Sequence, residues 1–207
     1  MMSKGRRMVI ATHNGHKTEE FRALLGEGWH VEDLTMHPDL PEPVEDGATF
    51  EENAGIKARS AAGRLGADVL VVADDSGLEV DGLGGRPGIF SARYAGPGAG
   101  DAGNRDKVLD ELTGVPPAGR GARFRCVLAV ARGEEVVACF SGAVEGRLTD
   151  AVAGQGGFGY DPIFIPEGHE STFGELPAAV KNGLSHRAKA LEKLLAWLED
   201  AELTSRL

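Results

Sequence analysis

The feature that most constrains this chain is a short apolar run that leads directly into two adjacent acids. Residues 69–73 are apolar and mostly β-branched, as is typical of a buried strand. Asp74, Asp75, Ser76 and Gly77 follow without a break. Ligands of open α/β sheets bind beyond the carboxyl ends of strands, so the acids are candidates for holding a metal or activating water. Asp-Ser-Gly is also ordinary turn chemistry, and the run alone leaves both interpretations open.

The composition favours a globular protein of one large domain, or of two lobes that share a sheet. The 207 residues are 42% hydrophobic and 26% charged, and the formal net charge of −10 disfavours nucleic acid or an anionic membrane as a partner. No stretch approaches the roughly 20 apolar residues of a membrane span, and residues 8–11 are too short for a signal peptide. We therefore expect a cytoplasmic protein in which Cys126 and Cys139 are buried, reduced thiols.

A polar loop joins the first expected strand, residues 8–11, to the first expected helix, residues 18–25. The start of a helix offers free N–H groups and a positive dipole end, which suit an anion such as phosphate. The loop adds neutral donors and one positive charge, in the residues Thr12, His13, Asn14, Gly15, His16 and Lys17. No Walker motif is present, and an Asn-Gly turn beside a solvated lysine is the alternative interpretation.

An acidic, proline-marked loop precedes the second expected helix. Thr49 and Glu52 match a capping box, with Thr49 as the N-cap of a helix that ends near Gly66. Capping accounts for Glu52 but not for Glu45, which is therefore the better candidate for function. Beyond the central acids we expect an ordered loop over 78–94, a helix over 101–112 and a hairpin of strands over 123–131 and 135–147.

Two features near the C-terminus predict contacts with a nucleotide. Phe158 and Tyr160 stand among glycines, so either ring could stack on a base, although two aromatics that fill the core are the alternative. Ser185 is a good N-cap for the last helix, whose first turn carries His186, Arg187 and Lys189, with Lys181 upstream. Cations at a helix N-terminus typically cost about 0.3–1 kcal/mol, so we expect an anion nearby.

Three groups of residues thus indicate a nucleoside triphosphate hydrolase without a P-loop. They are the acids Asp74, Asp75 and Glu45, with Glu52 as a fourth candidate, the phosphate-type group Thr12, Asn14, Lys17 and Lys181, and the base-reading group Phe158, His186 and Arg187. The acids can hold Mg²⁺ through oxygen ligands, and a carboxylate can take a proton from the attacking water. The chain resembles the Ham1-type inosine/xanthosine triphosphate pyrophosphatases over almost its whole length. The resemblance rests on motifs in one order: Ala11-Thr12-x-Asn14-x-x-Lys17, Thr49-Phe50-x-Glu52-Asn53-Ala54, Ala73-Asp74-Asp75-Ser76-Gly77-Leu78, Gly84-Gly85-x-Pro87-Gly88-Ile89, Ser91-Ala92-Arg93-Tyr94, Gly157-Phe158-Gly159-Tyr160-Asp161-Pro162 and Ser185-His186-Arg187.

That resemblance implies hydrolysis of a non-canonical purine nucleoside triphosphate (ITP, dITP or XTP) to the monophosphate and pyrophosphate with Mg²⁺. It implies that Asp75 is the proton acceptor and a metal ligand, with Glu45 as the second metal ligand and Glu42 and Asp46 as alternatives to Glu45. Asp74 is left as a supporting residue. The implied substrate contacts are Thr12, His13, Asn14, Gly15, His16, Lys17, Ser76, Phe158, Gly159, Tyr160, Asp161, Lys181, His186 and Arg187.

The implied fold is an elongated, two-lobed α/β protein, a single domain over residues 1–207 and usually a homodimer. A long central mixed sheet is flanked by helices, and the active-site cleft lies between the lobes. Two other functions remain open at this point: a Maf-type nucleotide pyrophosphatase, and a regulatory module that binds a triphosphate without hydrolysing it. The clustered acids argue against the regulatory module.

Overall fold

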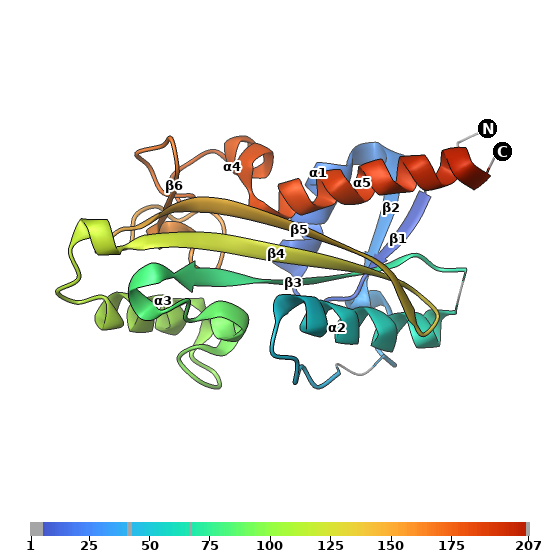
Figure 1. Cartoon of the computed structure of the whole chain (residues 1–207), viewed down its shortest axis with the longest axis horizontal. Helices are drawn as coiled ribbons and strands as arrows, with labels where there is room; N and C mark the ends of the chain where they lie inside the picture. The colour runs from blue at the N-terminus through green and yellow to red at the C-terminus, as the bar shows by residue number, and fades with distance from the viewer. Residues whose placement is uncertain (1–5, 41–42, 67, 206–207) are drawn as a thin grey trace. The chain divides into compact units, whose positions relative to one another are not determined.

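A mixed sheet of six strands, flanked by helices, forms the scaffold of the protein (Figure 1). The computed structural model describes residues 6–40, 43–66 and 68–205. Its strand order is β2-β1-β3-β4-β5-β6, in which β1 pairs in parallel with β2 and β3, and β6 pairs antiparallel to β5. The strands are β1 (Arg6–Ile10), β2 (Trp29–Asp33), β3 (Val71–Val80), β4 (Gly121–Arg132), β5 (Glu135–Leu148) and β6 (Phe164–Pro166). The α-helices are α1 (Gly15–Leu25), α2 (Phe50–Leu65), α3 (Gly100–Glu111), α4 (Ala178–Leu184) and α5 (His186–Ser205).

The chain divides into two compact units, and β3, β4 and β5 run from one into the other. The first unit comprises Met1–Asp75, Val127–Ser141 and Ala190–Leu207, and the second comprises Ser76–Cys126 and Gly142–Lys189. Asp75 and Ser76, neighbours in the predicted active-site motif, therefore belong to different units.

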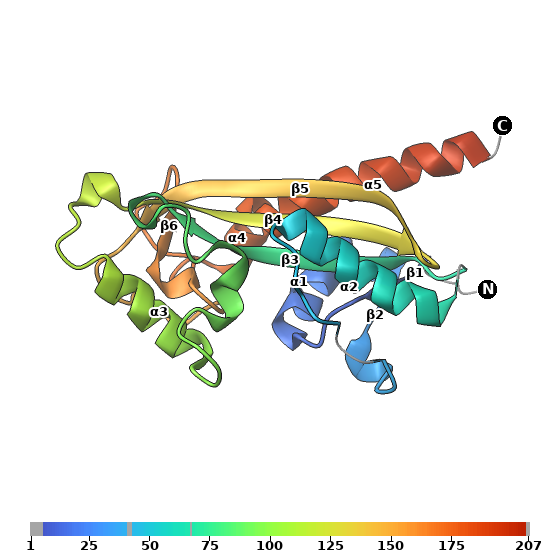
Figure 2. The same ribbon diagram turned by 60° about the horizontal axis from the view of Figure 1, so that its bottom comes forward.

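The first unit packs its helices on the strands through small and apolar side chains. Met8, Val9 and Ile10 of β1 are completely buried, as strands covered on both faces require. On α2 the buried positions Ala54, Ala58, Ala61 and Ala62 form a face of small residues that allows close packing. Within this unit α2 and α5 lie on opposite sides of the strands in both views (Figures 1 and 2).

The second unit has an aromatic core. Phe124 and Phe164 have ring centroids 4.6 Å apart, and Phe164 and Phe173 stack at 5.4 Å. Leu78 and Val80 of β3 pack in the same cluster. These contacts hold the second half of β3, which carries Ser76, against the loops that follow β5.

The expectation that the apolar strand ends at the two acids is wrong, and so is the alternative of a turn at Asp74-Asp75-Ser76-Gly77. β3 continues from Val71 to Val80, so both acids lie inside the strand. Within the described residues β1 pairs with β3 through Val71 and Val72 and then ends, so Asp74 lies just beyond the end of its neighbour. Lysines of the same unit neutralise the two acids, as described below, and this neutralisation permits a strand with buried carboxylates.

The other expected elements are largely confirmed. The predicted Thr49 cap and the helix that ends before Gly66 are present, as are the helix at 101–112 and the hairpin. Strand β2 and the short helix α4 were not predicted. The expectation of two buried cysteines is wrong for Cys139, which is exposed because outward-facing residues alternate along this part of β5. No helix in the described part of the chain is long and apolar enough to cross a membrane.

Candidate active site

The first unit holds Asp74 in a short ion pair with Lys17. Asp74 Oδ1 lies 2.5 Å from Lys17 Nζ, and the side chain of Asp74 is completely buried. Lys17 Nζ also lies 3.4 Å from the main-chain oxygen of Asp74. Lys17 therefore reaches from the first turn of α1 to β3, which joins the predicted phosphate loop to the predicted acid pair.

Asp75 lies in a second ion pair, with Lys57 of α2. Lys57 Nζ lies 2.6 Å from Asp75 Oδ1 and 3.2 Å from Glu45 Oε2. Burial raises the pKa of Asp75, and the nearby Lys57 ammonium offsets this effect only in part. Burial alone would lower the pKa of Lys57, but attraction to Asp75 and a hydrogen bond with it prevail and raise that pKa. Lys57 therefore stays charged and holds two carboxylates close together.

Lys57 was not among the predicted site residues. Its partners Glu45 and Asp75 are 12 and 18 residues away in the sequence, so no local sequence pattern predicts these ion pairs. One signal was present: Lys57 interrupts the small-residue face of α2, between Ala54 and Ala61. A long cation on a face that packs against strands needs a buried partner.

The loop before α2 presents Glu45 to this cluster. Asn53, which is completely buried, accepts a hydrogen bond from Gly47 N–H at its Oδ1 (2.9 Å). Glu52 accepts one from Ala48 N–H (2.6 Å), while Thr49 caps Glu52 N–H (3.1 Å). The Thr49 cap is thus confirmed, whereas the Glu52 carboxylate bonds the N–H of Ala48 rather than that of the N-cap Thr49. Together with Asn53 these bonds fix the loop that carries Glu45.

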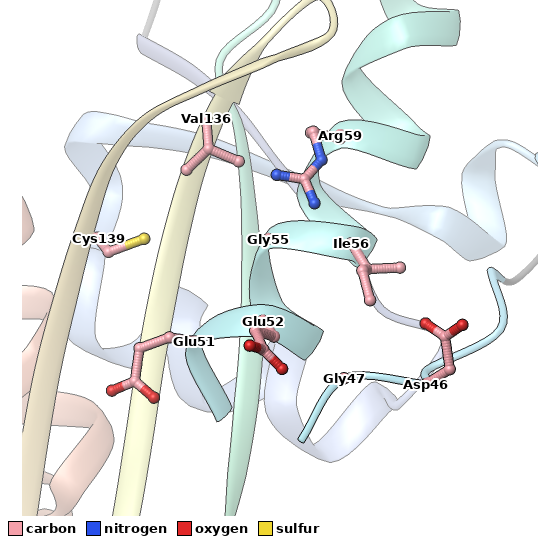
Figure 3. Close-up of a pocket in the computed structure, with 9 residues that line it drawn as sticks. All are labelled: Asp46, Gly47, Glu51, Glu52, Gly55, Ile56, Arg59, Val136 and Cys139. Atoms are coloured by element: carbon pink, nitrogen blue, oxygen red, sulfur yellow. The ribbon is translucent and has the colours of Figure 1, made fainter. Parts of the chain in front are cut away.

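The structure distinguishes Glu45 from Asp46, one of its two predicted alternatives. Asp46 lines a pocket of about 540 Å³ between α2 and β5, and neither Glu45, Lys57 nor Asp75 lines that pocket (Figure 3). The carboxylate of Asp46 is exposed there rather than bonded to Lys57. Glu42 lies outside the described residues. Glu45 is therefore the acid that joins Asp75 through Lys57.

The predicted phosphate loop is arranged differently from the expectation of free helix N–H groups. Asn14 caps α1, and its Oδ1 accepts from His16 N–H (3.0 Å) and Lys17 N–H (3.4 Å). Asn14 N–H in turn donates to Thr12 Oγ1 (3.1 Å). His13, Gly15 and His16 are exposed. Two of the amides expected for an anion are thus already bonded, which leaves Lys17 as the main charged group of this loop.

Two carboxylates of this cluster fit a divalent cation. Asp75 Oδ2 is buried and has no hydrogen-bond partner within the described residues, whereas Asp75 Oδ1 and Glu45 share Lys57. Mg²⁺ binds in many enzymes through one or two carboxylates, with phosphate and water as the remaining ligands. Among the described residues no group of three or more His, Cys, Asp or Glu side chains is arranged around one point as a metal site.

The second unit contains a cluster centred on Phe158. Lys181 Nζ lies 4.8 Å from the centroid of the Phe158 ring and 2.5 Å from Asp161 Oδ2. Asp161 Oδ2 also accepts a hydrogen bond from Phe158 N–H (2.8 Å). Lys181 and Asp161 are both buried, so this ion pair is shielded from water and fixes the loop that carries the ring.

Arg187 and His186, at the start of α5, belong to the same unit. Arg187 is completely buried, its Nη2 lies 3.2 Å from Ser76 Oγ, and its Cζ lies 5.8 Å from the Phe158 centroid. His186 stacks on Phe124 with ring centroids 5.0 Å apart. Ser185 caps the helix through Ala188 N–H (3.1 Å), as predicted. Of the predicted cations, Lys181 and Arg187 therefore lie near the Phe158 ring, whereas His186 lies against Phe124.

The two aromatics of the glycine loop have different surroundings. Tyr160 is buried in the core of the second unit, and its hydroxyl donates to the Ser91 main-chain oxygen (2.8 Å). Phe158 is only partly buried. Filling of the core, the alternative interpretation for both rings, thus applies to Tyr160, while Phe158 and Gly159 remain partly accessible.

Known proteins match this chain over almost its whole length. The Ham1 family model matches residues 8–197. The chain is 49% identical to a dITP/XTP pyrophosphatase of Shouchella clausii over 93% of this chain and 96% of that protein. It is 47% identical to a dITP/XTP pyrophosphatase of Bacillus subtilis over 92% of this chain and 96% of that protein. The solved Ham1 protein of Staphylococcus aureus superposes with a TM-score of 0.82 at 39% identity, covering 95% of this chain and all of that one. The chain belongs to the Ham1 family.

Proposed function

We propose that this protein hydrolyses non-canonical purine nucleoside triphosphates (ITP, dITP or XTP) to the monophosphate and pyrophosphate. The observation that carries the proposal is the Asp75–Lys57–Glu45 cluster, in which a buried carboxylate oxygen of Asp75 lacks a partner within the described residues. The names of the similar proteins from Shouchella clausii and Bacillus subtilis support the same substrates. The enzyme is thus a hydrolase of nucleotide metabolism.

In the proposed mechanism Asp75 is the base that accepts a proton from the water attacking the α-phosphorus. The raised pKa of Asp75 suits this role, because a stronger base takes the proton more readily. Asp75 and Glu45 would hold Mg²⁺, which when bound neutralises phosphate oxygens. Lys17 offers its charge to the departing pyrophosphate, with Thr12 and Asn14 beside it. Asp74 orients Lys17 through their short ion pair.

Recognition of the base is proposed for the cluster in the second unit. Phe158 offers a ring for stacking, which is worth about 1–3 kcal/mol per base in single-strand nucleic-acid sites. Inosine and xanthosine carry a 6-keto acceptor, whereas adenosine carries a 6-amino donor. Phe158 N–H and Gly159 N–H donate to Asp161 and Asp101, and Asp161 N–H donates to the Phe158 main-chain oxygen. Donors to the 6-keto group are therefore assigned to side chains.

His186 and Arg187 are those side chains in the proposal, with Lys181 and Ser76 beside them. A site built around a hydrogen bond can reject a base that lacks the matching group by about 10⁴-fold or more. Adenine would place a donor against these donors and would be rejected. The two alternative functions, a Maf-type pyrophosphatase and a regulatory module, are not favoured. Similar proteins are named dITP/XTP pyrophosphatases, and that name describes neither alternative.

The proposal also covers the location, the oligomeric state, the partner and the cofactor of the enzyme. We place it in the cytoplasm, as a homodimer, with a nucleotide rather than nucleic acid or membrane as its partner. Mg²⁺ is the proposed cofactor, with one or more ions per subunit, because the available ligands are hard carboxylate oxygens.

One assay tests the reaction directly. The purified protein is incubated with ITP, dITP, XTP, GTP and ATP, with and without Mg²⁺, and both pyrophosphate and orthophosphate are measured. We expect pyrophosphate from the first three nucleotides and only with the metal. Orthophosphate as the product would mean attack at the γ-phosphorus and would overturn the mechanism, while turnover of no nucleotide would overturn the function.

A further inference from the structure

Helix α3 holds one residue of the glycine loop from both sides. Asp101 Oδ2 accepts a hydrogen bond from Gly159 N–H at 2.7 Å. Arg105 Nη1 donates to the Gly159 main-chain oxygen, also at 2.7 Å. Asp101 and Arg105 are four residues apart and so lie on the same face of the helix. Both hydrogen bonds involve a charged partner, which makes them stronger than ordinary ones.

Gly159 is one of the positive-φ glycines of this loop, where such a restraint removes backbone freedom. Its φ is +58°, in the left-handed region that glycine adopts readily, and a glycine retains more backbone freedom than any other residue. The residues on either side have different surroundings: Tyr160 is anchored in the core, whereas Phe158 is partly exposed under Lys181. The conformation of Gly159 therefore sets the direction in which the chain leaves the core and presents the Phe158 ring.

Arg105 keeps this contact in spite of a cost. Its Nε is buried and has no hydrogen-bond partner within the described residues. A buried donor without an acceptor is unfavourable, and an arginine that only supported the surface of α3 would keep its whole guanidinium in water. The unfavourable burial of Arg105 Nε indicates that the hydrogen bond to the Gly159 oxygen determines where this side chain lies.

We propose that Asp101 and Arg105 are positioning residues for base recognition, which hold Gly159 so that Phe158 is presented to the purine. The inference rests on the proposed function. Neither side chain is assigned to the substrate. The Asp75–Lys57–Glu45 cluster and Lys17, to which the chemistry is assigned, belong to the other unit. Loss of either residue therefore changes the KM for the nucleotide rather than kcat.

The test combines kinetics with hydrogen–deuterium exchange on the full-length enzyme. In Asp101→Ala and in Arg105→Met we expect the KM for ITP to rise about 10-fold, with kcat within 3-fold of wild type. That size corresponds to the lower end of the loss of a hydrogen bond to a charged group. Exchange of the Gly159 amide should accelerate about 10-fold in Asp101→Ala. Asp101→Asn keeps an acceptor oxygen and should recover most of the KM, and Asp106→Ala, an exposed acid on the same helix, is the matched control.

The outcomes separate the inference from the function beneath it. Unchanged Gly159 exchange in Asp101→Ala, or a fall in kcat with KM unchanged, would overturn the positioning role even in an active enzyme. If the wild type released no pyrophosphate, the proposed function would fail by itself. Faster Gly159 exchange in the variant would then still support the hold of α3 on the loop. Reduced thermal stability common to Asp101→Ala and Asp101→Asn, without recovery of KM in the latter, would show a merely structural effect.

Discussion

The two clusters that carry the proposed site are built with opposite imbalances of charge. In the first unit three carboxylates, Asp74, Asp75 and Glu45, face two lysines, and one buried oxygen of Asp75 has no partner within the described residues. In the second unit two cations, Lys181 and Arg187, lie near one aromatic ring and one buried acid, Asp161. The first cluster is therefore suited to a metal cation, and the second to a planar, electron-rich base.

The clusters also differ in how their charges are held. The acids of the first lie on a strand and a loop and are held by lysines from helices α1 and α2. The second is a loop whose main-chain N–H groups donate to carboxylates, Phe158 N–H to Asp161 of the loop and Gly159 N–H to Asp101 of α3. A substitution in the first cluster should thus lower the rate of hydrolysis, and a substitution in the second should weaken the binding of the nucleotide.

The largest effect is expected from Asp75→Asn. Loss of a general base typically costs about 10²–10⁴-fold in rate, and this variant also removes a proposed metal ligand, so kcat should fall by at least that factor. Pyrophosphate release from ITP measures it, and binding of ITP by calorimetry should persist because the second cluster is intact. A rate near that of the wild type would remove Asp75 from the role of base.

The next effect concerns the buried pair of the second unit. Lys181→Met leaves Asp161 buried without its counter-ion, and breaking such a pair typically destabilises a protein by about 3–5 kcal/mol. Urea unfolding should show this loss of free energy. The double variant Lys181→Met/Asp161→Asn removes the stranded charge, so it should regain part of the stability but not the affinity for ITP. Equal instability of the single and double variants would contradict the role given to this pair.

A smaller effect is expected from Phe158→Ala. Stacking of a base is worth about 1–3 kcal/mol, so the KM for ITP should rise about 5- to 100-fold while kcat changes little. Tyr160→Phe is the matched comparison: it loses only the hydroxyl that bonds the Ser91 oxygen, and should lower the melting temperature without a comparable rise in KM. If Tyr160→Phe raised the KM as much as Phe158→Ala, the division between the two aromatics would be wrong.

The smallest effect is expected for a substitution in an ion cluster that lies outside the proposed site and serves as a comparison for it. Glu32 bonds Arg7 at 2.7 Å and His37 at 3.0 Å, and the hydrogen bond from Arg7 is the main reason why its pKa is lowered to about 2. A lowered pKa stabilises the fold above the unfolded value of 4.5, and this stability is lost as the pH falls toward 2.

Glu32→Gln should therefore cost about 1–2 kcal/mol of unfolding free energy at pH 7, discounted because Arg7 is about half exposed. The difference from the wild type should shrink as the pH falls from 4.5 toward 2, and kcat at pH 7 should be unchanged. Urea unfolding at several pH values checks the first expectation and the pyrophosphate assay the second. A difference that stayed constant across this range would mean that the charge of Glu32 contributes nothing.

Local patterns predicted the elements that depend on neighbours in the sequence. The Thr49 cap, the Ser185 cap and the apolar start of β3 follow from interactions within a few residues, and all three are confirmed. The continuation of β3 through Asp74–Gly77 could not be predicted, since buried carboxylates and glycine disfavour a strand. Their stability there depends on Lys17 and Lys57, which are distant in the sequence.

The motif Asp74-Asp75-Ser76-Gly77 shows the same difference between local and tertiary effects. The sequence by itself determined that an apolar strand leads into two acids, and which helices begin at Thr49 and Ser185, because these features rest on local periodicity and capping. Only the tertiary structure decided that Asp74 pairs with Lys17, that Asp75 shares Lys57 with Glu45, and that Phe158 rather than Tyr160 remains accessible. Those outcomes depend on burial, since a charge withdrawn from water requires whichever partner the fold brings within hydrogen-bond distance.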